Sequence, residues 1–159
     1  MHANARMKPF RHRPLTQGEA ALGAEMFGAG LDAARVRLLA IPVWDRAFVA
    51  GPALIVWPQT GARLDFGQAP LREQATFVHE LTHVWQAQNG VKLIRAKLRA
   101  GDGRNAYAYD LADDPDFADL NIEQQAMVVE HAFLASRGGA TPYPAETYAA
   151  RSQAWRRNA

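Results

Sequence analysis

The spacing of apolar residues changes once along the chain, from short runs to a helical period. Two apolar runs, residues 36–41 and 53–57, are rich in branched side chains and bounded by glycine or proline, which predicts buried β-strands. After a turn at residues 58–61, the segment 63–66 is expected to form a short, half-exposed third strand. We therefore expect a small antiparallel sheet in the first half of the chain.

From Pro70 onward, apolar residues recur every three to four positions, the period of an amphipathic helix. Pro70 suits a first helical turn and Gly90 suits a stop, so a helix is predicted over about residues 70–88. Similar patterns predict helices near residues 91–98, 120–136 and 143–155. Thr16 and Glu19 form a capping-box pattern that begins another helix. The fold class predicted is α+β, with the sheet packed on the helix of residues 70–88.

Length and composition fit one globular domain. The chain has 159 residues, 48% hydrophobic and 21% charged. We expect a basic flexible tail at residues 1–14 and a single domain at residues 15–159. The basic start lacks a signal-peptide core, and the longest apolar stretch, residues 47–57, is too short to span a bilayer. These features predict a cytoplasmic protein that does not enter membranes.

Charge and cysteine content exclude several classes of partner and active site. The formal net charge is +2, and the basic clusters at residues 6–13, 92–104 and 151–157 carry no pattern of stacking aromatics, so nucleic acid is not expected as a partner. There is no cysteine, which excludes disulfides, thiolate nucleophiles and cysteine-bound zinc. Any metal must be bound by His, Asp or Glu.

The strongest chemical signal is the sequence HELTH at residues 79–83. His79 and His83 lie one turn apart on one face of the predicted helix, where both imidazoles can bind one zinc ion. Phe77 and Leu81 lie on the opposite, apolar face. Glu80 lies beside the two histidines, where its carboxylate can take a proton from water as a general base. This pattern arises by chance in roughly one such sequence in a hundred.

A catalytic zinc site needs a third protein ligand from outside this helix. Glu123 begins the next strongly periodic segment and is the preferred candidate, while Glu130 and His131 remain as alternatives. Tyr107 and Tyr109 are candidate donors to the oxyanion that forms during peptide hydrolysis. Core packing is the alternative role for at least one of these two tyrosines.

These residues resemble a known family. The chain is similar to the bacterial Vgr-related proteins, zinc metallopeptidases akin to the H-E-x-x-H-V-x-Q domains of contractile secretion systems. The likeness covers about residues 15–135 and rests on LTQGE at 15–19, FG at 27–28, VR at 36–37, FVHELTHVWQAQ at 77–88, YAYD at 107–110, IEQQA at 122–126 and HAFL at 131–134.

The resemblance implies a zincin-like fold, with His79, His83 and Glu123 as zinc ligands and Glu80 as general base. In thermolysin-like enzymes an Asp four residues after the third ligand orients a histidine. Met127 occupies that position here, so the support of the histidines must be built differently.

The function expected is zinc-dependent hydrolysis of a peptide or protein substrate, with the substrate lying along the strand predicted at residues 63–66. Two alternatives remain. One is a non-catalytic zincin-fold module that binds a secretion-system component, with a fourth protein ligand closing the zinc site. The other is a DNA-associated zinc peptidase that uses the basic segments.

Overall fold

A computed structural model describes residues 5–156 of the chain. The helices are α1 (Gln17–Phe27), α2 (Leu71–Gln88), α3 (Leu93–Ala100), α4 (Arg104–Tyr107), α5 (Ile122–Ser136) and α6 (Ala145–Ala149). The strands are β1 (His12–Pro14), β2 (Arg37–Ile41), β3 (Phe48–Val49) and β4 (Leu54–Pro58). The α+β prediction is confirmed, and the helices predicted at residues 70–88, 91–98 and 120–136 are all present.

The sheet is mixed, so the prediction of an antiparallel sheet is wrong. Its strand order is β1-β2-β4-β3, and the central pair β2 and β4 is parallel. The reason is β3, which the sequence pattern did not reveal because it has only two residues. β3 runs antiparallel to β4 and reverses the chain once more, so that β4 returns in the direction of β2. β3 is therefore the edge strand at one end of the sheet.

The strand predicted at residues 63–66 is also absent. Arg63 makes one isolated bridge with Arg6, and the chain then turns into a 3-10 helix at Phe66–Gln68. Asp65 causes this turn, because its carboxylate accepts a hydrogen bond from the backbone N–H of Gly67 at 2.8 Å. This segment cannot offer an extended edge to a substrate.

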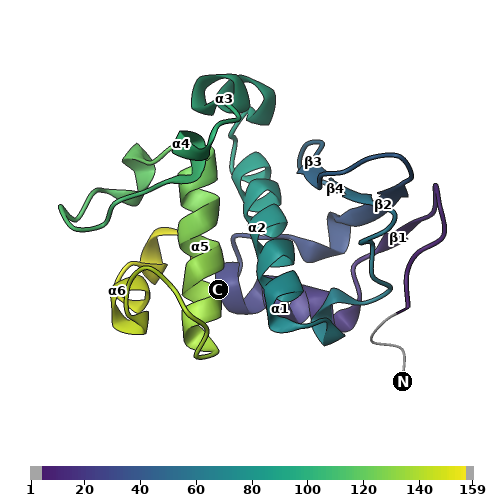
Figure 1. Ribbon diagram of the computed structural model, residues 1–159, viewed down its shortest axis with the longest axis horizontal. Coiled ribbons are helices and arrows are strands. Elements are labelled where there is room, and N and C mark those ends of the chain that lie inside the picture. The colour runs from purple at the N-terminus through teal and green to yellow at the C-terminus, as the bar shows by residue number, and fades with distance from the viewer. Residues whose placement is uncertain (1–4, 157–159) are drawn as a thin grey trace.

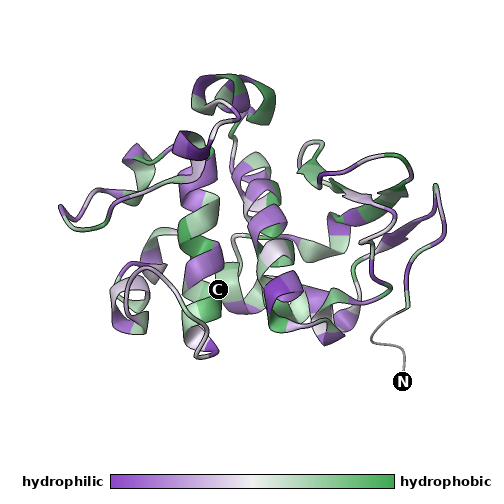
Figure 2. Cartoon of the chain, in the orientation of Figure 1, coloured by the Kyte–Doolittle hydropathy of each residue, from purple (hydrophilic) through white to green (hydrophobic). Residues whose placement is uncertain are grey.

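Helix α2 lies at the centre of the fold, between the sheet on one side and α5 on the other (Figure 1). Phe77 and Leu81 are fully buried, as the sequence pattern predicted, and so is Val84 one turn further along. Phe77 stacks on Phe66 with ring centroids 5.0 Å apart. Polar (purple) and apolar (green) positions both occur along α5, as expected for a helix that packs on the core with one side (Figure 2). α2 is therefore packed on both sides.

The basic start of the chain takes part in the fold, which corrects the prediction of a flexible tail for residues 5–14. Met7 is buried, and β1 pairs with β2. Arg13 forms a two-pronged ion pair with the buried carboxylate of Glu19, with both N–O distances 2.7 Å. Residues 1–4 lie outside the described part of the chain. Among the helices of residues 5–156, none has the length and apolar character needed to cross a bilayer.

Candidate metal centre

Two helices bring the three candidate ligands together. His79 and His83 project from the same side of α2 because they are four residues apart. Glu123 lies in the first turn of α5, whose start is fixed by a capping box between Asn121 and Gln124. All three side chains are buried, and their candidate ligand atoms lie within 4.8 Å of one another.

Two of the separations between candidate ligand atoms match those around a small tetrahedral ion. The Nε2 atoms of His79 and His83 lie 3.3 and 3.2 Å from the same oxygen, Oε2 of Glu123. Bonds of about 2.0–2.1 Å to a tetrahedral zinc ion place neighbouring ligand atoms about 3.4 Å apart. Two neutral imidazoles and one carboxylate are also a donor set that zinc prefers. The residues present therefore fit a zinc ion.

The far nitrogen of each imidazole is held by a second side chain. Nδ1 of His79 lies 2.9 Å from Oε2 of Glu130, and Nδ1 of His83 lies 2.8 Å from Oε1 of Gln86. Gln86 is fixed in turn, because its amide donates to the carbonyl of Ile122 at 3.0 Å. These contacts leave the Nε2 atoms facing Glu123 and set the orientation of both rings. Glu130, two turns after Glu123, is thus the carboxylate that contacts the far nitrogen of His79, and Met127 is not needed for this contact.

The carboxylate of Glu123 is kept ionised by its neighbours. Burial raises its pKa, but hydrogen bonds with His79, His83 and Lys97 outweigh burial and hold the pKa well below its usual range. Lys97, from α3, donates from Nζ to Oε1 of Glu123 at 2.5 Å. One carboxylate oxygen is therefore directed at the histidines and the other at a cation.

His79 is strongly coupled to the surrounding carboxylates. Burial lowers its pKa, while hydrogen bonds with Glu123 and Glu130 raise it, with a net rise to about 10. An imidazole must give up its proton before Nε2 can bind a metal ion. Metal binding at this site should therefore release protons at neutral pH.

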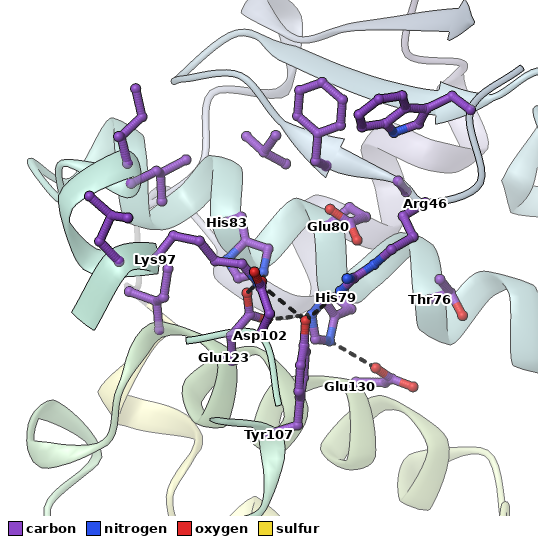
Figure 3. A pocket seen from close by; sticks show the side chains of 18 residues that line it. Arg46, Thr76, His79, Glu80, His83, Lys97, Asp102, Tyr107, Glu123 and Glu130 are labelled. Atoms are coloured by element: carbon purple, nitrogen blue, oxygen red, sulfur yellow. Dashed lines mark hydrogen bonds and ion pairs between the residues drawn. The ribbon is translucent and has the colours of Figure 1, made fainter. Parts of the chain in front are cut away.

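Glu80 lies beside the ligand group and outside it. Its side chain lines the same cleft, and its Oε2 atom is buried without a hydrogen-bond partner (Figure 3). Burial raises the pKa of this carboxyl above its ordinary value, although the nearby His83 and His79 oppose the rise. A carboxyl group with a raised pKa and a free oxygen is suited to accepting and returning a proton.

The two candidate tyrosines have different surroundings. Tyr107, at the end of α4, lies in the cleft, with its ring centroid 6.3 Å from that of His79. Its phenol oxygen accepts hydrogen bonds from Arg46 at 3.0 Å and Lys97 at 3.2 Å. Tyr109 is not among the residues that line the cleft. Its hydroxyl lies 2.7 Å from that of Tyr148 on α6, within a packed cluster of polar aromatic residues.

His131, the alternative third ligand, belongs to the same cluster as Tyr109 and Tyr148. Its Nδ1 lies 2.5 Å from the Tyr109 hydroxyl, and it is not part of the three-residue ligand group. Burial lowers its pKa, with nearby Glu130 opposing and His79 and Arg72 adding to the shift. The neutral imidazole can then accept the hydrogen bond from Tyr109.

This geometry predicts a pH effect on stability. Because the folded-state pKa of His131 is lowered, the unfolded chain binds the extra proton first as the pH falls below about 6.5. The contribution of His131 to stability is therefore present above that pH and declines on acidification. Urea unfolding in excess EDTA measures the free energy of unfolding. Between pH 7 and pH 5 this free energy should fall more for the wild type than for His131→Asn. Equal losses would show that His131 is not held neutral.

The ligand group opens into a cleft of about 690 Å³. One wall is formed by α3, and the opposite wall by the arm of residues 44–49, which ends in β3. Figure 3 shows Arg46 and Lys97 reaching toward Tyr107 from these opposite sides. The edge strand beside the candidate ligands is thus β3. The sequence had suggested residues 63–66 for this position.

Sequence reasoning missed three residues of this site. The signal for Gln86 is its spacing, because it lies three residues after His83 and so on the same side of the predicted helix. Arg46 and Lys97 had no comparable signal, because each comes from a separate segment that only the folded chain brings to Tyr107.

Comparisons with known proteins support a relation to a secretion-system protein. No protein-family model matches the chain. The chain is 35% identical over 134 residues to the type VI secretion system spike protein VgrG2b of Pseudomonas aeruginosa. The match covers 77% of this chain and 13% of the spike protein, so the chain spans about an eighth of that relative.

A solved structure gives the same relation. The effector domain of Pseudomonas aeruginosa VgrG2b superposes with a TM-score of 0.70 and 28% sequence identity. The superposition covers 97% of this chain and 89% of that domain. Sequence and fold together relate the chain to the effector domain of this spike protein.

Proposed function

We propose that this chain is a zinc-dependent peptidase with a zincin-like arrangement of its active site. The observation that carries the proposal is the buried group of His79, His83 and Glu123, with the unpartnered carboxylate of Glu80 beside it in an open cleft. A purely structural zinc site would have a fourth protein ligand and no adjoining cleft. Within residues 5–156, the candidate ligand group has three members.

The ligands would be His79 and His83 through Nε2 and Glu123 through Oε2. When bound, a zinc ion supplies Lewis acidity, which lowers the pKa of a coordinated water and polarises a scissile carbonyl. The contacts of Glu130, Gln86 and Lys97 support this role, because they hold the ligand side chains in position before the metal binds.

Glu80 would act as general base and then as general acid. Its free Oε2 can take a proton from the attacking water, and the same carboxyl can pass that proton to the leaving amine. The raised pKa of Glu80 makes the second transfer easier than it would be from an ordinary carboxyl.

Tyr107 would stabilise the oxyanion. Arg46 and Lys97 both donate to the phenol oxygen, so the phenol hydrogen is free to point into the cleft and donate to a substrate oxygen. Nothing comparable supports a catalytic role for Tyr109, whose hydroxyl is engaged by Tyr148 and His131. We assign Tyr109 to packing, the alternative that the sequence left open for one of the two tyrosines.

The substrate would be an extended polypeptide. β3 is the last strand of the sheet and lies against the cleft, so its outer edge can pair with a substrate backbone. The similarity to an effector domain supports delivery by a type VI secretion system and action outside the cell that makes it. This proposal replaces the cytoplasmic location expected from the sequence.

Metal removal and restoration test the function. The protein stripped with a chelator should not cleave an unfolded protein such as reduced casein, and one equivalent of zinc should restore cleavage. Products should be followed by mass spectrometry. Equal cleavage with and without zinc, or none after zinc is shown to be bound, would contradict the proposal.

A further inference from the structure

Large apolar side chains gather at the mouth of the cleft, in contact with water. Seven large hydrophobic residues are exposed in the described part of the chain, and four of them line this one cleft. The four are Trp44 (48% exposed), Phe48 (41%), Ile94 (83%) and Leu98 (81%). Exposed apolar residues that collect at one concave site usually mark a binding surface.

The first wall is formed by α3. Ile94 and Leu98 are four residues apart, so they form one apolar ridge on this short helix. Lys97, between them in sequence, lines the same cleft and donates a hydrogen bond to Glu123. The ridge and the ligand group are thus presented by the same helix.

The second wall is aromatic. Trp44 and Phe48 contact each other edge to face, with ring centroids 5.6 Å apart. Arg46 lies between them in the chain, and its hydrogen bond to Tyr107 ties this arm to the floor of the cleft. Arg46 of this arm and Lys97 of α3 reach Tyr107 from opposite sides of the cleft, so the aromatic pair and the α3 ridge belong to opposite walls (Figure 3).

We infer that the cleft selects polypeptides with a large apolar side chain, aromatic or branched aliphatic, close to the bond that is cleaved. This inference rests on the proposed peptidase function. The specificity-determining residues are Trp44, Phe48, Ile94 and Leu98, which would enclose such a side chain while β3 pairs with the substrate backbone. The volume of about 690 Å³ accommodates a large side chain together with adjoining backbone.

The shape of the surface favours this occupant over two others. The four side chains are exposed, and they line one hollow together with the ionisable residues His79, Glu80 and Glu123. A membrane or a second copy of the chain that covered the four side chains would also remove these ionisable residues from water without pairing them, which costs free energy. A polypeptide can fill the hollow with one side chain and leave its polar backbone in contact with β3.

Cleavage-site profiling tests the inference. The zinc-loaded protein should be given a randomised peptide library, and the cleaved bonds identified by mass spectrometry. We expect enrichment of Phe, Leu, Ile or Trp at one position beside the cleaved bond. Ile94→Ser with Leu98→Ser should reduce this preference about 10-fold, through KM more than kcat, because apolar burial is lost.

The matched control is Val43→Ser. Val43 is a fully exposed apolar residue on the loop just before Trp44 and does not line the cleft. Its cleavage profile should equal that of the wild type. Thermal melting should show that the Ile94→Ser, Leu98→Ser variant remains folded, since both side chains are largely exposed.

Binding distinguishes a failure of this inference from a failure of the peptidase proposal. The Glu80→Gln protein should be titrated with pairs of capped peptides that carry Leu or Ser at the selected position. If nothing is cleaved, Leu and Ser should be compared at each peptide position in turn. Tighter binding of the Leu peptides than of the Ser peptides supports the inference even without cleavage, provided that the Ile94→Ser, Leu98→Ser substitutions remove the difference. Equal binding of the Leu and Ser peptides overturns it. It is also overturned if the ridge substitutions leave peptide selection unchanged but abolish self-association in sedimentation, or binding to phosphatidylglycerol vesicles.

Discussion

Replacement of Glu80 by Gln should reduce peptide hydrolysis by about 10²- to 10⁴-fold and leave zinc bound. The amide has the shape of the carboxyl group but cannot take a proton from water. Zinc binding should persist because Glu80 is not a member of the three-residue ligand group. Hydrolysis of a fluorogenic peptide and zinc content by mass spectrometry measure the two effects separately.

Glu73→Gln is the matched control for this substitution. Glu73 lies on the same helix, but its carboxylate is paired with Arg63 and does not line the cleft. Its activity should remain near that of the wild type. Loss of zinc from Glu80→Gln would make Glu80 a ligand, and undiminished hydrolysis would remove it from the mechanism.

Replacement of Glu123 by Ala should weaken zinc binding at least 100-fold. Removal of a direct ligand exceeds the loss of about 10- to 100-fold that is typical for a residue supporting a ligand. Glu130→Ala should fall in that smaller range, because Glu130 contacts the far nitrogen of His79. His131→Ala should change affinity little, since His131 bonds to Tyr109 instead.

Competition with a chromophoric zinc chelator gives these three affinities. The test is the ranking of the three losses in zinc affinity. The size of each loss also depends on the change in local charge that the substitution makes. A larger loss for His131→Ala than for Glu123→Ala would move the third ligand to His131. A larger loss for Glu130→Ala would move it to Glu130.

The parts of the fold that the sequence predicted well are those set by local chemistry. The capping box of Thr16 and Glu19 begins α1, and the 3.6-residue period gives α2 and its apolar face. His79 and His83 share a side of α2 because helix geometry alone fixes their spacing. The sequence alone could therefore place the two histidines on one side of α2, with Glu80 beside them.

The parts that were wrong or missing depend on contacts between distant segments. β3 has two residues, too few for an alternating pattern, and its position makes the sheet mixed. The segment around Asp65 has the composition of a strand, but hydrogen bonds from Thr16 and Gly67 to its carboxylate hold it in a turn. The N-terminal segment looked like a tail because its anchor, Glu19, becomes buried only in the folded protein.

The choice among Glu123, Glu130 and His131 had the same difficulty. All three lie on α5, and spacing along one helix cannot say which of them meets a second helix at the ligand distance. The packing of α5 on α2 brings Glu123 to the Nε2 atoms, Glu130 to Nδ1 of His79, and His131 to neither.

A crystal structure of the zinc-loaded protein, with data collected at the zinc absorption edge, tests the central claim most directly. We predict one zinc ion bound by Nε2 of His79, Nε2 of His83 and a carboxylate oxygen of Glu123, with its remaining position open to the cleft and Glu80 beside that position. A fourth protein ligand that closes the site, or zinc bound elsewhere, would contradict a catalytic metal centre and favour a non-catalytic binding module.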